Sequence, residues 1–122
     1  MAATFLVKII SPDRVLFSGE AEMVACRTEI GEIAFLAGHV PFVGSLDACK
    51  VRVILADGSG EEVFAVKSGF VQVRSNTLTV LSDLALGASE VDAPYLQSAK
   101  DDSGESERDI RWVSVLEELA GA

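Results

Sequence analysis

The sequence predicts a mainly β protein: an N-terminal flattened β-sandwich or barrel of about eight to ten strands, followed by a short C-terminal α-helical hairpin. In residues 4–86, short apolar or alternating segments recur, and turn-forming residues interrupt them every ~8–12 residues. After Gly87 the alternation stops and apolar residues recur at helical spacing. We therefore expect two parts, residues 1–86 and residues 87–122.

Strands are expected in the first part wherever β-branched and aromatic residues form short runs between two turn signals. The expected strands are residues 5–9, 15–17, 23–26, 33–36, 51–55, 63–66, 70–73 and 78–81. Turn-forming residues separate them at 11–14, 18–19, 29–32, 57–60, 68–69 and 75–76. The short connections between the last four strands predict consecutive hairpins.

The second part is expected to begin with a short helix. Asp92 is suited to cap its N-terminus, and Pro94 suits its first turn, where a missing N–H costs nothing. Its apolar face consists of Val91, Tyr95, Leu96 and Ala99. A polar stretch at residues 101–105 then breaks the pattern.

A second helix is expected after this break. Ser106, followed three residues later by Asp109, resembles an N-terminal cap, and Gly121 suits the C-terminal end. The helix carries a broad apolar stripe made of Ile110, Trp112, Val113, Val115, Leu116 and Leu119. A hairpin with this much apolar surface must dock on another surface.

The charge balance excludes some classes of partner. Ten Lys and Arg against nineteen Asp and Glu give a net charge of −9, and such a surface repels the phosphates of nucleic acids. No apolar stretch approaches the ~20 residues of a membrane-spanning helix. The N-terminus lacks the basic region and the small-residue cleavage site of a leader peptide. We expect a cytoplasmic protein made in mature form, without direct membrane insertion.

Side chains suited to catalysis or metal binding are few. His39 is the single histidine, so a nucleophile would have only one candidate base. Cys26 and Cys49 lie in apolar segments and are expected to be buried thiols. Glu29 and Glu32 are three residues apart but have no histidine beside them, and solvated turn carboxylates are the simpler interpretation. We expect no catalytic residues, no metal and no cofactor.

Several short motifs follow one another in a specific order. They are I-S-P-D at 10–13, L-F-S-G at 16–19, T-E-I-G-E-I at 28–33, L-A-G-H-V-P at 36–41, A-V at 65–66, G-F-V-Q-V at 69–73 and N-T-L-T-V-L-S-D at 76–83. The most specific feature is G-E-I followed by L-x-G-H-x-P, with the closing V-L-S-D strand region at 80–83 further along. In this order and spacing the chain resembles the N-terminal domain of the epsilon subunit of bacterial F-type ATP synthases.

The resemblance implies a function and a set of partners. It implies a non-catalytic central-stalk (rotor) subunit that couples proton-driven rotation of the c-ring, through the gamma subunit, to ATP synthesis. In the family the sandwich clamps the foot of gamma, and loops at one end rest on the c-ring. The chain would then lie on the cytoplasmic side of the bacterial cell membrane, as a peripheral part of the complex.

The resemblance also implies contact residues by position. The candidate c-ring or gamma contacts are Thr28, Glu29, Ile30, Gly31 and Glu32 in one loop, and Gly38, His39 and Pro41 in the next. Gly31 and Gly38 are expected in tight turns that require positive φ. His39 has a second interpretation, as a turn residue whose ring hydrogen-bonds to the backbone, and both interpretations can hold together.

The tail departs from the family pattern. Many bacterial members carry Ile/Leu-Asp-x-x-Arg-Ala at the start of the first helix, where it binds ATP. Here Asp92 remains, but Tyr95 replaces the arginine and Leu96 replaces the small residue, so we expect no ATP binding. The family's second helix is often basic and reaches the beta subunit to block hydrolysis. Glu117 and Glu118 in this helix would oppose such insertion, so inhibition through the tail is expected to be weak.

Two other functions compete with the rotor subunit. The first is a non-catalytic β-sandwich adaptor that binds another soluble protein. The second is an enzyme with a minimal site at His39, which the scarcity of candidate side chains places last. Co-purification with gamma separates the rotor subunit from the adaptor.

Overall fold

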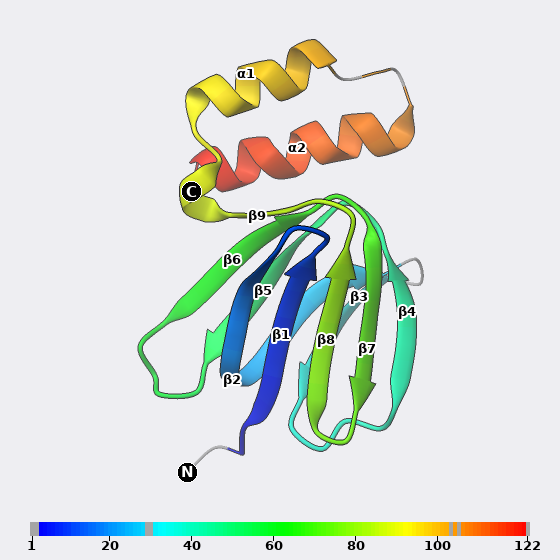
Figure 1. Cartoon of the computed structure of the whole chain (residues 1–122), viewed down its shortest axis with the longest axis vertical. Coiled ribbons are helices and arrows are strands. Elements are labelled where there is room, and N and C mark those ends of the chain that lie inside the picture. Colours follow the sequence, from blue (N-terminus) through cyan, green and yellow to red (C-terminus); the bar gives the residue numbers. More distant parts are fainter. Residues whose placement is uncertain (1–2, 29–30, 103, 105, 122) are drawn as a thin grey trace.

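The fold is seen in a computed structural model that describes residues 3–28, 31–102, 104 and 106–121. Figure 1 shows a β-sandwich with two helices packed across one of its ends. The elements are β1 (Phe5–Ser11), β2 (Arg14–Thr28), β3 (Gly31–Leu36), β4 (Phe42–Leu46), β5 (Cys49–Leu55), β6 (Glu61–Val66), β7 (Gly69–Arg74), β8 (Thr77–Ser82), β9 (Ala85–Gly87), a 3-10 helix (Ala88–Glu90), α1 (Ala93–Asp102) and α2 (Glu107–Gly121). The predicted mainly β fold with a C-terminal helical hairpin is confirmed.

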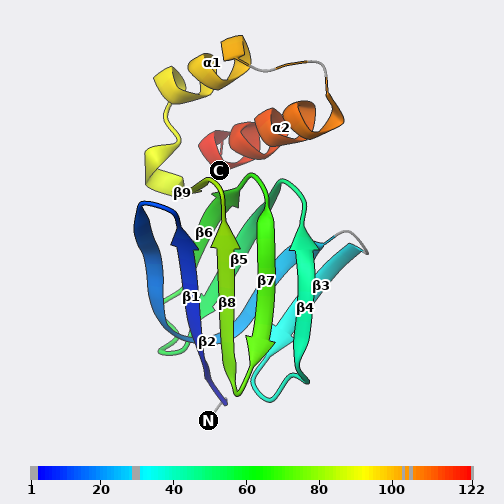
Figure 2. The same ribbon diagram turned by 45° about the vertical axis from the view of Figure 1, so that its right-hand side comes forward.

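The strands form one nine-stranded sheet that folds over into two layers (Figure 2). The hydrogen-bonded order is β1-β8-β7-β4-β2-β5-β6-β9, with β3 paired to β2 and β1 also paired to β2. β2 has 15 residues and takes part in both layers, because its first half pairs with β1 and its second half with β3 and β5. β1 runs parallel to β8, and the other pairs are antiparallel.

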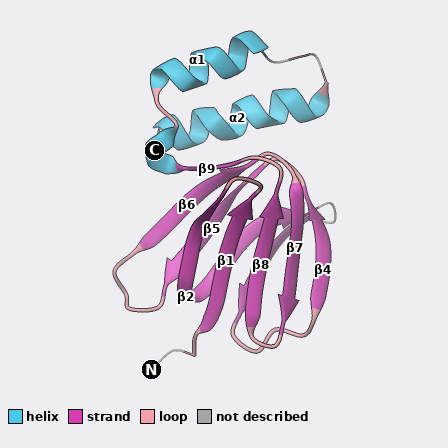
Figure 3. Cartoon of the chain, in the orientation of Figure 1, coloured by secondary structure: helices cyan, strands magenta, loops and turns pink. Residues whose placement is uncertain are grey.

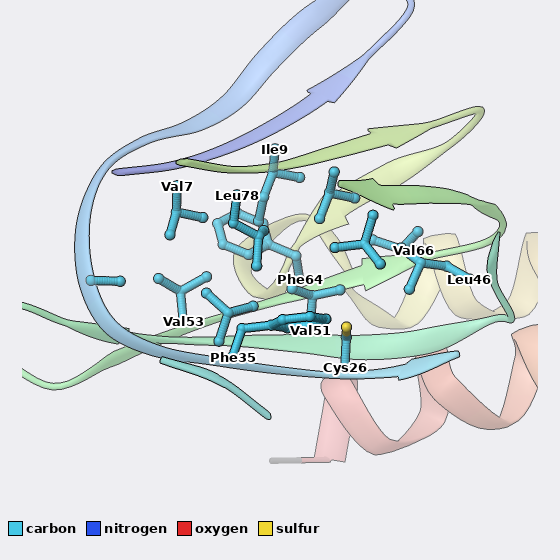
Figure 4. Packing of buried hydrophobic residues seen from close by; sticks show 14 of the residues in the cluster. Val7, Ile9, Cys26, Phe35, Leu46, Val51, Val53, Phe64, Val66 and Leu78 are labelled. Atoms are coloured by element: carbon cyan, nitrogen blue, oxygen red, sulfur yellow. The ribbon is translucent and has the colours of Figure 1, made fainter. Parts of the chain in front are cut away.

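The space between the two layers is filled by alternate side chains of the strands. In β1, for example, Phe5, Val7 and Ile9 are buried and the residues between them are partly exposed. Figure 4 shows Val7 and Ile9 pointing into the core toward side chains of the opposite layer, such as Val53 and Phe64. The buried cluster consists of Phe5, Val7, Ile9, Ala21, Val24, Cys26, Phe35, Leu46, Cys49, Val51, Val53, Phe64, Val66, Val71, Val73, Leu78, Val80 and Ala85. Each large side chain buried here contributes about 1.5–3 kcal/mol.

The expected break at residues 18–19 is wrong. Ser18 and Gly19 pair with Lys8 and Val7 of β1, so the two strands predicted at 15–17 and 23–26 are one continuous strand. Small residues and a glycine look like a turn in the sequence, but here the neighbouring strand supplies backbone hydrogen bonds that keep the chain extended.

Two strands, β4 and β9, were not expected. β4 contains Gly44, which reads as a turn residue in the sequence. A Cβ at Gly44 would lie only 2.8 Å from the ring of Phe42, so the glycine makes room for this ring within the strand. β9 has three residues and pairs with β6 at Phe64–Val66 only as a short extension of the sheet.

The two helix caps are confirmed. The backbone N–H of Tyr95 donates to the Asp92 carboxylate at 2.9 Å, and the N–H of Asp109 donates to the Ser106 hydroxyl at 3.1 Å. α1 continues to Asp102, so Asp101 and Asp102, which were expected to lie in the polar break, belong to the helix. Ser103 and Glu105 lie outside the described residues.

The hairpin is folded back on the sandwich, and Figure 3 shows α2 as the helix nearer to the strands. A second cluster joins the two parts; it consists of Ala48, Ala65, Leu86, Val91, Trp112, Val115, Leu116 and Leu119. Tyr95, Leu96 and Ala99 of α1 pack on it and stay partly exposed. One member of the predicted stripe is misplaced: Ile110 is 61% exposed, because the docked face of α2 is narrower than the sequence stripe.

Candidate functional site

The loop between β3 and β4 lies at the end of the sandwich away from the helices (Figure 1). Its first turn is closed by the N–H of His39, which donates to the carbonyl of Leu36 at 3.1 Å. Gly38 has φ +79°, as predicted, which is the value that the third residue of a type II turn requires. Pro41 then leads directly into β4. We call residues 37–41 the distal loop.

The His39 side chain is held by its neighbours. Its ring stands at 64° to Phe35 with the centroids 4.9 Å apart, and its Nδ1 lies 2.7 Å from the carbonyl of Val40. Because a carbonyl only accepts, Nδ1 carries the proton and donates. His39 is therefore the turn residue of the second interpretation, and its ring is partly exposed at the tip of the sandwich. A role in partner contact remains compatible with this geometry.

The other predicted contact loop lies at the opposite end of β3. Thr28 pairs with Gly31 and with Leu46, at the end of β4 near the helices, and its hydroxyl donates to the carbonyl of Gly31 at 3.0 Å. Gly31 has φ +122°, again as predicted. Glu32 lines an open groove together with Arg111 of α2. Glu29 and Ile30 lie outside the described residues. The structure therefore does not bring the two sets of predicted contact residues together.

A third surface was not singled out by the sequence. It is the outer side of the layer formed by β1, β8, β7 and β4, and we call it the outer face. Its residues are Leu6, Lys8, Ile10, Val43, Ser45, Phe70, Gln72, Arg74, Thr77, Thr79 and Leu81. Phe70 is 57% exposed, lies opposite Leu81 of β8 and Ser45 of β4, and is joined on this face by Val43, which is 70% exposed.

The outer face is distinguished by its charge. It contains Lys8 and Arg74 and no Asp or Glu, although the chain has nineteen acidic residues. The outer side of the other layer carries charges of both signs, such as Glu32 and Arg52, and α2 covers part of it. Large exposed apolar side chains on an acid-free sheet face mark a protein-binding surface.

In the described part of the tail, the Asp92 carboxylate is engaged in a helix cap, that of α1. The position of the family arginine is held by Tyr95, whose ring packs on the second cluster. Two ion pairs instead join α2 to the sandwich: Lys50 with Glu118 at 3.3 Å and Arg111 with Asp47 at 3.3 Å.

The two cysteines are free and buried, as expected. Burial raises the pKa of the Cys26 thiol to about 12, with a smaller contribution from neighbouring Cys49. A thiol with this pKa carries almost no thiolate at neutral pH and is a poor nucleophile. In the described part of the chain, we find no group of three or more His, Cys, Asp or Glu side chains that could hold a metal ion. None of the described helices is both long and apolar enough to span a membrane.

These observations define the class of protein. It is a β-sandwich with a structured end loop and an acid-free sheet face that exposes large apolar side chains. These are features of a protein-binding module. The family model for the ATP synthase delta/epsilon chain β-sandwich domain matches residues 4–88. The chain belongs to this family.

Curated relatives extend the match into the tail. An ATP synthase epsilon chain of Dichelobacter nodosus is 40% identical over 100 residues, which cover 82% of this chain and 69% of the relative. An ATP synthase epsilon chain of Bacillus pumilus is 38% identical over 117 residues, covering 92% and 88%. A solved structure of the central stalk and c-ring of Tetrahymena thermophila mitochondrial ATP synthase is similar in fold, with a TM-score of 0.67, 14% identity and 96% coverage of both chains.

Proposed function

We propose that this chain is the non-catalytic epsilon subunit of the central stalk of a bacterial F-type ATP synthase. It rotates with gamma and the c-ring and transmits torque, while other subunits of the complex make ATP. The observation that carries this proposal is the family match over residues 4–88, together with curated epsilon chains that are 38–40% identical over 100 to 117 residues. A close-packed sandwich suits the role, because packed interiors have low compressibility and transmit strain.

The outer face is the proposed gamma-binding surface. It offers Phe70 and Leu81 side by side as apolar anchors, and Lys8 and Arg74 as the charged groups that fix the orientation. Aromatic residues and arginine are the side chains that most often dominate the affinity of interfaces.

The distal loop is the proposed contact to the c-ring, with Gly38, His39 and Pro41 at its exposed end. Thr28, Glu29, Ile30, Gly31 and Glu32 form a second proposed contact. Since this second group lies at the other end of β3, beside α2, it would reach a different part of the assembly from the distal loop. The chain is a peripheral subunit of the complex, and we place it on the cytoplasmic side of the membrane.

The tail is proposed to have little regulatory strength. No ATP binding is expected at millimolar concentrations, because Tyr95 stands where the family has a cation, and an equilibrium titration that gives submillimolar affinity would refute this. Insertion of α2 beside an acidic segment of the beta subunit is opposed by Glu117 and Glu118. Deleting residues 88–122 should therefore raise the ATPase rate of the complex by less than about twofold.

The test is a pull-down from solubilised membranes with the chain tagged at its N-terminus. Recovery of alpha, beta and gamma with ATPase activity is the expected result. Phe70→Glu should lower recovery at least about tenfold, since a central aromatic anchor contributes about 2 kcal/mol or more. Ile110→Glu, at a similarly exposed apolar position on α2, is the matched control and should recover the complex normally. Recovery of one unrelated soluble protein without gamma would favour the adaptor instead.

A further inference from the structure

Asn76 occupies an unusual place in the backbone. Ser75 and Asn76 have φ values of +52° and +58° and are the two non-glycine residues with positive φ in the described part of the chain. They form the two-residue turn between β7 and β8, in which Arg74 pairs with Thr77. A turn of this kind requires positive φ at both central residues, and asparagine tolerates it well. Turn geometry alone therefore explains an asparagine here.

The side chain of Asn76 does more than the turn requires. Its Oδ1 accepts a hydrogen bond from the N–H of Gly38 at 3.0 Å, and its Nδ2 donates to the carbonyl of Thr4 at 3.0 Å. Its main-chain carbonyl also accepts from the N–H of Leu6 at 3.2 Å. Because Gly38 offers a donor and Thr4 an acceptor, the carboxamide satisfies both at once, which a carboxylate or an ammonium group cannot do.

These hydrogen bonds connect three segments that are far apart in the sequence. They join the start of β1, the distal loop and the β7–β8 turn at the end of the sandwich opposite the helices (Figure 1). Among the described residues, the bond from Gly38 to Asn76 is the one hydrogen bond that ties residues 37–41 to a segment outside β3, β4 and the loop itself. The loop would otherwise be held only by its own turn and by the rings of Phe35 and Phe42 around His39.

We propose that Asn76 is a positioning residue for partner binding: its carboxamide fixes the distal loop, the proposed c-ring contact, against the layer whose outer face is the proposed gamma contact, so that the loop is preformed for the c-ring. This inference rests on the proposed function. A preformed loop raises affinity because binding no longer has to order it. Asn76 acts through Gly38 and the loop, and need not touch the partner itself.

The test compares two glycine variants of the same turn. Asn76→Gly keeps the positive φ and removes the carboxamide. Ser75→Gly is the matched control, because Ser75 has the same backbone conformation and its side chain makes no hydrogen bond to a described residue. Each full-length variant is titrated into the complex depleted of this subunit, and hydrogen exchange of the peptide containing Gly38 is measured in the free chain.

Asn76→Gly should weaken rebinding at least about fivefold and speed exchange at Gly38 at least about tenfold, whereas Ser75→Gly should stay within about twofold on both. Asn76→Asp should have a rebinding affinity and an exchange rate between those of the two glycine variants, since a carboxylate still accepts from Gly38 but cannot donate to Thr4. If Asn76→Gly does not fold, Asn76→Asp supplies the comparison.

A double-mutant cycle with His39→Ala separates positioning from general stability. If Asn76 acts through the loop, His39→Ala should cost clearly less affinity in the Asn76→Gly background than in the wild type. Additive losses, or rebinding of Asn76→Gly equal to that of Ser75→Gly, would overturn the inference and leave the proposed function intact. Failure of the wild-type chain to rebind would overturn both.

Discussion

The sandwich and the helical hairpin differ in how each holds its apolar side chains. In the sandwich, buried side chains come from all nine strands, which are also joined by backbone hydrogen bonds. In the hairpin, α1 contributes no buried side chain and α2 contributes Trp112, Val115, Leu116 and Leu119. The hairpin therefore depends on the sandwich for burial, whereas the sandwich core is complete without it. We therefore expect the sandwich to be stable on its own and the hairpin to undock more easily than the sandwich unfolds.

Two leucines allow a direct comparison, because Leu78 in the sandwich and Leu116 in the hairpin are both fully buried. Leu78→Ala should lower the free energy of unfolding of the sandwich by about 2–5 kcal/mol, the usual cost of a cavity in a core. Urea denaturation followed by circular dichroism in the β region measures it. A loss below about 1 kcal/mol would mean that the core relaxes around the cavity.

Leu116→Ala should instead weaken the docking of the hairpin on the sandwich. The sandwich unfolding midpoint should shift by no more than the equivalent of about 0.5 kcal/mol, because its core keeps all its contacts. Trp112 is the single tryptophan and is buried between the two regions, so its emission should move to longer wavelength as the hairpin loosens. A sandwich destabilised as much as by Leu78→Ala would show that the two regions fold as one unit.

Asp92→Ala tests whether α1 can be weakened without any change in the sandwich. Removing the carboxylate leaves the N–H of Tyr95 without its partner and should cost α1 about 1 kcal/mol. The expected readout is a small loss of helical circular dichroism with no change in thiol protection in the sandwich. Asp92→Asn retains a capping oxygen and should restore most of the helix signal.

The smallest expected effect is a pH dependence of hairpin docking, which arises at Glu90 in the connection between β9 and α1. Glu90 accepts from the N–H of Gly87 at 3.0 Å and forms an ion pair with Arg14, and these interactions, the first being the larger, lower the pKa of its carboxyl. A lowered pKa stabilises the folded form above the unfolded value of roughly 4.3, and this contribution is lost as the pH falls through the folded pKa.

The side chains of Arg14 and Glu90 are 42% and 37% exposed, so their ion pair should contribute less than about 1 kcal/mol to the stability of the folded form. Trp112 emission recorded between neutral pH and pH 3 should show a transition that Glu90→Gln reduces. An unchanged transition in this variant would contradict the assignment of the pH response to Glu90.

Local sequence patterns predicted much of this architecture. Alternation located most strands, the Asp92 and Ser106 caps located both helices, and glycines marked the turns at Gly31 and Gly38. The strand through Gly19 was mispredicted because its extended form depends on β1, which no local pattern reports.

The proposed contact surfaces were harder to predict, because they too depend on the pairing of strands that are far apart in the sequence. The outer face exists only once the register of β1, β8, β7 and β4 is known, since its residues are spread from Leu6 to Leu81. The hydrogen bonds of Asn76 join residues 38 and 72 positions apart, beyond the reach of any turn rule. Sequence reasoning proposed His39 and two contact loops, but it did not predict that these loops lie at opposite ends of β3.

One unfolding experiment tests the difference between the two regions most directly, because the chain carries a natural probe in each. Cys26 and Cys49 report exposure of the sandwich core through reaction with a thiol reagent, and Trp112 reports release of the hairpin through its emission. In a single urea titration, Trp112 emission should change at lower urea than thiol reactivity. Coincident transitions would contradict a releasable hairpin on an independently stable sandwich.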